Sequence, residues 1–122
     1  MTNQIQNPNN KKKYDLRERT AKFGEDVLRF VMTLPQNAIN TPLISQLVRA
    51  ATSIGANYME ADAAESKKDF NHKIAICKKE SKESMHWIHM ISIVNPTRKE
   101  ECRKLWKEAH ELALIFSSIL KK

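Results

Sequence analysis

Apolar side chains recur three or four residues apart along most of this chain, the spacing that aligns them on one face of an α-helix. Four such segments follow one another between residue 16 and the C-terminus. The first has Leu16, Thr20, Phe23, Val27, Phe30 and Leu34 on one face. We predict that it stops at Pro35, because proline lacks an amide hydrogen and clashes with the preceding helical turn.

The second segment is predicted to begin at Asn40 or Thr41, since either side chain can cap a helix and Pro42 is tolerated in the first turn. Its centre, residues 50–57, consists mainly of small residues and contains Gly55. Glycine inside a helix costs about 1 kcal/mol relative to alanine. We therefore expect a neighbouring helix to approach closely at Gly55.

The third segment carries two adjacent apolar stripes and is predicted to pack against neighbours on two sides. Ser66 is expected to cap it, with Asp69 in the first turn, and residues 95–96 are expected to end it. The fourth helix is predicted to open with a capping box formed by Thr97 and Glu100. Four amphipathic helices with short connections predict an all-α fold, an antiparallel up-and-down four-helix bundle.

Residues 1–14 are polar and rich in asparagine, and they include three consecutive lysines. Such a segment buries too little apolar surface to offset its ordering entropy, so we predict a disordered basic arm. Residues 15–122 are predicted to form a single domain. The chain has 21 basic and 14 acidic residues, a net charge of +7. The excess lies on the arm and on residues 66–122.

Basic side chains of the last two helices are candidates for binding RNA or DNA. They are Lys67, Lys68, Lys78, Lys79, Lys82, Arg98, Lys99 and Arg103. Each phosphate that such a surface neutralises releases counterions, so the affinity would fall with salt. Glutamates are interleaved and the sequence has no evident aromatic stacking platform, so an ordinary solvated surface is an equal alternative.

A polar stripe on the second helix faces comparable residues of the third. We interpret it as a network between helices or subunits, formed by Arg49, Ser53, Asn57, Glu60, Glu80, Glu83 and Trp87. Arg49 would meet a carboxylate of the third helix. The alternative is a polar pocket with a catalytic carboxylate pair. The network is favoured because no nucleophile or metal motif accompanies the stripe.

Few residues of the chain suggest metal or covalent chemistry. Glu83 and His86 match half of a ferritin-like di-metal motif, but the second half is missing, and His86 and His89 would bind a metal only weakly. Cys77 and Cys102 fall on apolar stripes and are predicted to be buried. We therefore expect no catalytic residue, no metal and no cofactor.

The sequence also lacks features of membrane insertion or export. No apolar run approaches the roughly 18 residues of a membrane helix, and no signal peptide is evident. These observations predict a cytoplasmic protein with no membrane partner.

The segment from Gln46 to Ile91 resembles the four-helix-bundle proteins encoded in intervening sequences of bacterial large-subunit ribosomal RNA genes. The family pattern on one helix is matched by Gln46, Arg49, Ser53, Ile54, Asn57 and Glu60. A further pattern is matched by residues 66–70 and by Lys79, Glu80, Glu83 and Trp87. The chain departs from it at His86, where relatives have an aromatic residue, and at Asp62, where many have glycine.

The resemblance implies a non-enzymatic bundle that assembles as a ring, typically a homopentamer. A similar bundle, the accessory protein of diversity-generating retroelements, is a basic pentamer that binds nucleic acid and a reverse transcriptase. Arg49, Asn57 and Glu60 would then be structural or subunit-contact residues, and the lysines would face nucleic acid. Two hypotheses follow: a homo-oligomer that binds RNA or DNA, or a structural module that binds another protein.

Overall fold

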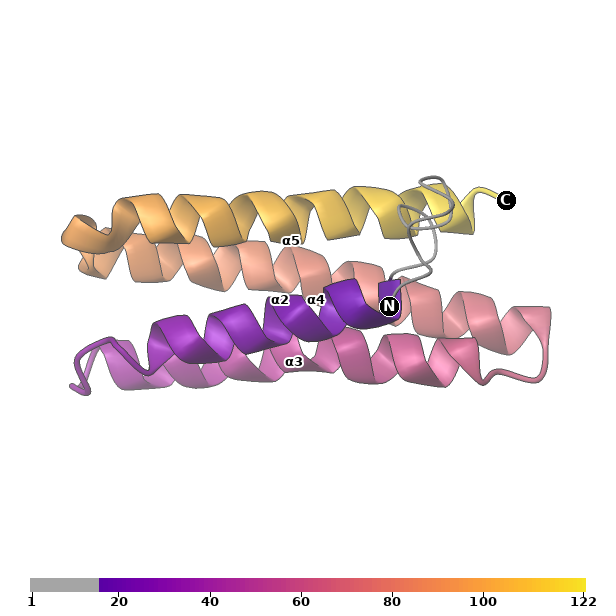
Figure 1. The fold of residues 1–122 in the computed structure, drawn as a ribbon, viewed down its shortest axis with the longest axis horizontal. Helices are drawn as coiled ribbons and strands as arrows, with labels where there is room; N and C mark the ends of the chain where they lie inside the picture. Colours follow the sequence, from indigo (N-terminus) through magenta and orange to yellow (C-terminus); the bar gives the residue numbers. More distant parts are fainter. Residues whose placement is uncertain (1–15) are drawn as a thin grey trace, which may run out of the picture.

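The computed structural model describes residues 16–122, and the disordered arm predicted for residues 1–14 lies outside them. The described residues form four α-helices and one short 3₁₀ helix. These are α2 (Leu16–Val31), α3 (Asn40–Asp62), α4 (Lys67–Val94), η2 (Pro96–Arg98) and α5 (Lys99–Leu120). Consecutive helices run in opposite directions (Figure 1). The predicted all-α four-helix fold is confirmed.

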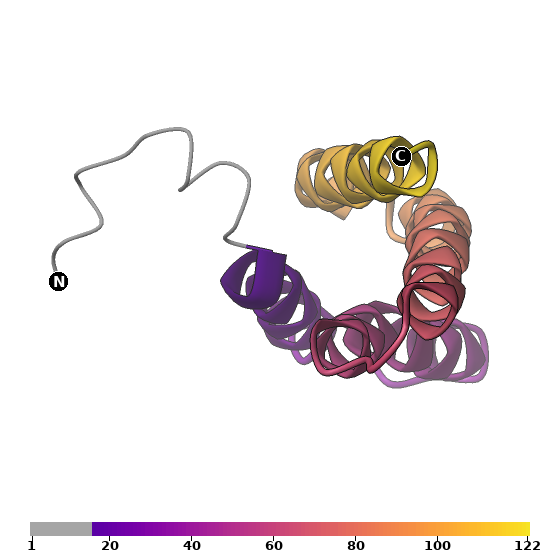
Figure 2. The same cartoon turned by 90° about the vertical axis from the view of Figure 1, so that its right-hand side faces the viewer.

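The four helices follow one another around an arc in chain order when viewed along the bundle (Figure 2). α4 packs against both α3 and α5, which agrees with the two apolar stripes on its sequence. α2 packs mainly against α3 and only slightly against α5. The first and last helices therefore form the weakest seam of the bundle.

The apolar stripes of all four helices meet in one core. Its largest fully buried side chains include Phe23, Leu47, Ile54, Ile88 and Phe116. Burying each such side chain contributes about 1.5–3 kcal/mol. Among residues 16–122, no helix is long and apolar enough to cross a lipid bilayer.

α3 begins at Asn40, as predicted, but neither Asn40 nor Thr41 caps it. In the turn before α3, Oδ1 of Asn37 accepts the backbone N–H groups of Ile39 at 3.0 Å and Asn40 at 2.8 Å. Asn40 is instead buried, and its side chain turns into the bundle to meet Asn95. The first helix also ends earlier than predicted, at Val31, although Leu34 remains buried.

The predictions for the two later helix starts have opposite outcomes. Ser66 caps α4 as predicted, accepting the backbone N–H of Asp69 at 3.0 Å. The capping box of Thr97 and Glu100 is wrong, because Thr97 lies inside η2 and α5 begins only at Lys99, with no side-chain cap. The 3₁₀ turn gives Thr97 a helical backbone, which a capping residue does not have.

Small residues allow α2 and α3 to approach closely. A Cβ atom added at Gly55 would lie 3.5 Å from Oγ1 of Thr20 and 3.6 Å from the backbone N of Ala21. The close helix approach expected at Gly55 is confirmed. These distances are ordinary van der Waals contacts, so the space would also admit an alanine.

Candidate nucleic-acid interface

Every arginine of the chain lies in the described part, and each has a carboxylate partner. The pairs are Arg17 with Asp62, Arg19 with Glu108, Arg29 with Glu25 and Asp26, Arg49 with Glu80 and Glu83, Arg98 with Glu101, and Arg103 with Glu100. The arginine charges are therefore balanced locally.

Most lysines, unlike the arginines, have no carboxylate partner among the described residues. Within residues 16–122, Lys22 pairs with Asp26 and Lys73 with Glu60. The other lysines of this part of the chain have no ion-pair partner and belong to α4, α5 or the C-terminus. They are Lys67, Lys68, Lys78, Lys79, Lys82, Lys99, Lys104, Lys107, Lys121 and Lys122. The unpaired positive charge is thus lysine charge on the second half of the bundle.

The eight basic residues predicted as a nucleic-acid surface do not form one compact patch. Lys67 and Lys68 begin α4, whereas Lys99 begins α5 at the opposite end of the bundle (Figure 1). The 28 residues of α4 span about 42 Å. Lys79 and Lys82 are exposed on the intervening part of α4, and Lys78 is half-buried.

Arg98 holds the end of the bundle together. Its guanidinium pairs with Glu101, donates to Oγ1 of Thr33 at 2.8 Å and lies 5.0 Å from the ring centroid of Phe30. The hydrogen bond to Glu101 raises the pKa of Arg98 and lowers the pKa of Glu101. Arg103 donates to Glu100 at 2.7 Å and 3.3 Å. The charge of each arginine is therefore partly offset by a carboxylate, unlike that of the unpaired lysines, although Nη1 of Arg103 keeps free hydrogen-bond donors.

The predicted polar network separates into independent units. Arg49 on α3 donates to Glu83 and, at 3.4 Å, to the buried Glu80 on α4. Nδ2 of Asn57 donates to the backbone oxygen and the Oγ of Ser53, at 2.9 and 3.0 Å, within α3.

A third unit joins the C-terminal end of α3 to the N-terminal part of α4. Glu60 pairs with Lys73 at 2.6 Å, and this hydrogen bond raises the pKa of Lys73. Trp87 joins none of the units. Its buried Nε1 has no hydrogen-bond partner among residues 16–122, and its ring lies edge-on to that of His86, with 4.7 Å between the ring centroids. The stripe thus links α3 to α4 at two separate points.

The histidine and cysteine candidates are also separated. Glu83 points to Arg49, and His86 lies against Trp87. Within residues 16–122, no group of three or more histidine, cysteine or acidic side chains is arranged to hold a metal ion. Cys77 and Cys102 are buried free thiols. Burial raises the pKa of Cys77 to about 12 and also raises that of Cys102, so both thiols are poor nucleophiles.

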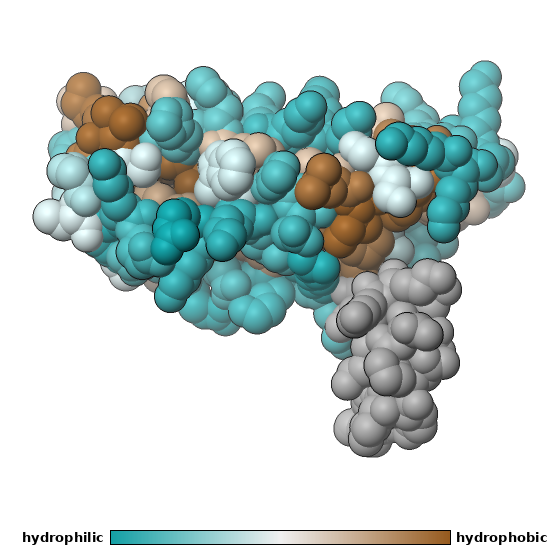
Figure 3. Space-filling model, turned by 90° about the horizontal axis from the view of Figure 1, so that it is seen from above, coloured by the Kyte–Doolittle hydropathy of each residue, from teal (hydrophilic) through white to brown (hydrophobic). Residues whose placement is uncertain are grey.

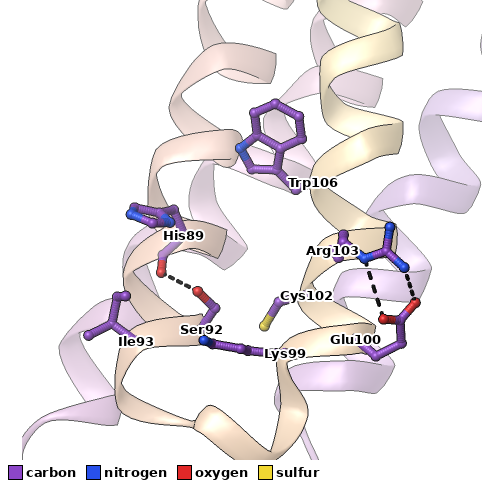
Figure 4. A pocket seen from close by; sticks show the side chains of 8 residues that line it. All are labelled: His89, Ser92, Ile93, Lys99, Glu100, Cys102, Arg103 and Trp106. Carbon is purple, nitrogen blue, oxygen red and sulfur yellow. Dashed lines mark hydrogen bonds and ion pairs between the residues drawn. The ribbon is translucent and has the colours of Figure 1, made fainter.

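A pocket between α4 and α5 contains a residue that sequence reasoning missed, Trp106. The pocket has a volume of about 500 Å³ and lies near the turn that joins the two helices (Figure 4). Its lining is His89, Ser92, Ile93, Lys99, Glu100, Cys102, Arg103 and Trp106. Lys99, Arg103 and Trp106 are spaced four and three residues apart, which was the available signal that they share a helix face.

The surface that carries α5 is mostly hydrophilic (Figure 3). Apolar side chains gather at two places on it, one at the left end of the view and one to the right of its centre. Leu114 of α5 is exposed, as are Ile93 and Val94 at the end of α4. α5 and the end of α4 therefore combine unpaired lysines with a few exposed apolar groups.

Comparison with known proteins assigns the family. No curated protein sequence matches the chain. A crystal structure from Bacteroides thetaiotaomicron, described as a protein of unknown function from the S23 ribosomal protein family, is similar with a TM-score of 0.77 and 25% identity. The similarity covers 88% of this chain and 99% of that one. The family model for the 23S rRNA-intervening sequence protein matches residues 12–118, and the chain therefore belongs to that family.

Proposed function

We propose that the protein is a non-enzymatic, homo-oligomeric helical bundle that binds RNA or DNA without sequence preference through α4 and α5. The observation that carries this proposal is the division of charge. The six arginines are neutralised by carboxylates, whereas ten lysines on α4, α5 and the C-terminus have no ion-pair partner among the described residues. A phosphate that binds these lysines displaces counterions without breaking an ion pair inside the protein.

The family name of the similar crystal structure adds support, since it associates that protein with the ribosome. Lysine also suits binding without sequence preference. Its ammonium group is a point charge on a flexible stem, whereas reading of base edges mostly uses the planar guanidinium or amide groups. The unpaired lysines of α4 and α5 therefore favour contact with the phosphate backbone.

The test compares two triple variants of equal net charge. One is Lys78→Gln/Lys79→Gln/Lys82→Gln on α4, and the control is Arg17→Gln/Lys22→Gln/Arg29→Gln on α2. Binding of a fluorescent single-stranded RNA is followed by anisotropy over a range of salt concentrations. We expect the α4 variant to reduce the slope of log affinity against log salt by about 0.7 for each phosphate that it no longer neutralises. The α2 variant should keep most of the wild-type slope.

Two results would overturn the nucleic-acid proposal. One is wild-type binding that does not respond to salt. The other is an equal loss of affinity in both variants, since net charge alone would then explain the binding. Circular dichroism of each variant establishes that its helices are intact. The alternative hypothesis, a structural module that binds another protein, predicts no RNA binding by the wild-type protein or by either variant.

Self-association is the second part of the proposal. Large apolar side chains are exposed at the end of the bundle that holds the α2–α3 and α4–α5 connections. Met32, Ile39 and Ile93 are 78%, 60% and 59% exposed. Large apolar groups that are exposed at one end of a molecule are candidates for contact surfaces between proteins. A ring of five chains would multiply the net charge fivefold and strengthen attraction of polyanions over a distance.

Native mass spectrometry tests the self-association. We expect a mass that is a multiple of the chain mass, and a smaller mass for Met32→Gln/Ile39→Gln. Met59→Gln on α3 is the matched control, because Met59 is similarly exposed but lies away from this end. A wild-type monomer at micromolar concentration would contradict the oligomeric part and leave the charge argument standing.

A further inference from the structure

We propose that the pocket between α4 and α5 binds one unstacked base of a single-stranded nucleic acid, with the base against Trp106 and the adjoining phosphate at Lys99 and Arg103. This inference rests on the proposed nucleic-acid function and names the site where the strand is held. It assigns the protein a preference for single strands, which binding to the lysine surface alone does not provide.

The pocket has the size and the walls for such a ligand. Its volume of about 500 Å³ lies within the range of about 300–1,000 Å³ that small-molecule sites occupy. Ile93 and His89 of α4 form one side, and Trp106 of α5 lies at the upper end of the pocket in Figure 4. A flat heterocycle thus has an aromatic ring and an apolar side chain in the lining of the same space.

The Trp106 ring is held in contact with a second aromatic side chain, His110. The imidazole of His110, one helical turn further along α5, lies 5.1 Å from the indole centroid at an angle of 31°. Trp106 is half-buried and packs against the core. A ring that is held in place loses little further freedom when a base stacks on it, and such stacking contributes about 1–3 kcal/mol per base.

The charges at the opposite end of the pocket suit a phosphate. Lys99 is exposed and has no ion-pair partner in the described chain, and Figure 4 shows its amine reaching towards Ser92 of α4. Arg103 binds Glu100 through Nε and Nη2, so Nη1 keeps its donors. Glu100 is the one acidic residue of the lining, and its charge is offset by Arg103.

The rest of the lining argues against a chemical role for the pocket. Cys102 lies on its wall, but burial raises the pKa of this thiol and keeps it protonated. Oγ of Ser92 donates to the backbone oxygen of His89 at 2.7 Å, which occupies its hydrogen. The pocket therefore has groups for stacking and for phosphate contact, and no activated nucleophile.

The test separates stacking from charge by using two probes with the same number of phosphates. One is a short oligothymidylate, and the other is an abasic oligomer of equal length. Wild-type protein should bind the oligothymidylate about tenfold more tightly, the factor that about 1.4 kcal/mol of stacking gives. Trp106→Leu should lose this preference while its affinity for the abasic oligomer stays unchanged. Trp106→Phe keeps an aromatic face and should retain most of the preference.

The outcomes distinguish this inference from the proposed function. If Trp106→Leu keeps the wild-type preference, the base is not held at Trp106, although salt-dependent binding of the abasic oligomer would still support the lysine surface. If neither probe binds, the proposed function itself fails. Should Trp106→Leu lose its helical signal, the readout becomes Trp106 fluorescence in a Trp87→Phe protein. Quenching by the oligothymidylate but not by the abasic oligomer is expected, and the absence of such quenching would overturn the inference.

Discussion

Arg19 and Glu108 form a two-point ion pair across the seam between α2 and α5. Nε of Arg19 lies 2.7 Å from Oε2 of Glu108, and Nη2 lies 2.9 Å from Oε1. About a third of each side chain is exposed. The two residues are 89 positions apart in the chain, so this pair joins the first and last helices where the packing between them is weakest.

The first prediction concerns this pair. Arg19→Ala and Glu108→Ala should each lower the free energy of unfolding. In a double-mutant cycle the coupling energy between them should be about 1 kcal/mol. This is the upper end of the range for exposed ion pairs, because the arginine binds the carboxylate in a bidentate way. Chemical denaturation gives the four free energies. Lys22 and Asp26, an exposed pair within α2, are the control and should couple by about 0.3–0.5 kcal/mol.

The second prediction concerns the amide pair at the end of the bundle. Nδ2 of Asn95 donates to Oδ1 of Asn40 at 2.8 Å, and Nδ2 of Asn40 donates back at 3.2 Å. Asn40→Ala should cost about 1–3 kcal/mol, because it removes the donor to the buried Oδ1 of Asn95, whereas Nδ2 of Asn95 still donates to the backbone oxygen of Ile91. The double variant with Asn95→Ala should cost less than the sum of the single changes. Additive costs in thermal or denaturant unfolding would contradict this coupling.

The third prediction is a gain of stability at Gly55. A methyl group there would meet Thr20 and Ala21 at ordinary contact distances of 3.5–3.6 Å. Gly55→Ala should therefore recover most of the helix propensity that glycine loses and raise the free energy of unfolding by about 0.5–1 kcal/mol. Gly55→Leu should destabilise the protein by forcing α2 away from α3. A lower melting temperature for Gly55→Ala would mean that the contact has no room for a methyl group.

The fourth prediction concerns Cys77, whose thiol lies 3.5 Å from the backbone oxygen of Ile54. A pKa raised from 9.0 to about 12 lowers the thiolate fraction near neutral pH by about a thousandfold. In a Cys102→Ser protein, Cys77 should react with a disulfide reagent only as fast as the protein opens. Labelling that becomes fast in denaturant and stays slow without it is the expected result. Rapid labelling of the folded protein would be incompatible with the burial of Cys77.

The fifth prediction is that the free energy of unfolding falls at high pH because of the Cys77 thiol. The pKa of Cys77 is higher in the folded protein than its ordinary value, so the folded state resists loss of the proton. The stability that depends on this thiol is complete below about pH 9 and declines as the pH rises towards 12. Cys77→Ala should therefore lose less stability than the wild-type protein over this range, measured by denaturant unfolding at each pH.

The number and type of helices follow from the sequence because each helix has a long, regular apolar stripe. Ser66 was also predictable as a cap, since capping by serine depends only on residues within one turn. Asn40 was not. Its type suits a cap, but a contact with Asn95, 55 positions away, takes its side chain into the core. Tertiary contacts of this kind override the local preference.

The candidate interface was predictable in part for the same reason. Lysine positions on α4 and α5 and the pairing of Arg98 with Glu101, three residues on, follow from helical spacing. The contacts of Arg98 with Thr33 and Phe30 depend on where the fold places α2. Trp106 carried a local signal in its spacing from Lys99 and Arg103. Its pocket also needs His89 and Ile93 from α4, and the position of α4 beside them comes only from the fold.

The arrangement of helices along an arc bears on how the chain is made. Each helix packs mostly on the one before it, so α3 can pair with α2 and α4 with α3 as they leave the ribosome. Contacts between neighbours in the chain favour rapid folding. The contact between Arg19 and Glu108 is different, because one partner is made early and the other near the end of synthesis. Although α2 emerges first, its contact with α5 is thus the last contact between helices that can form.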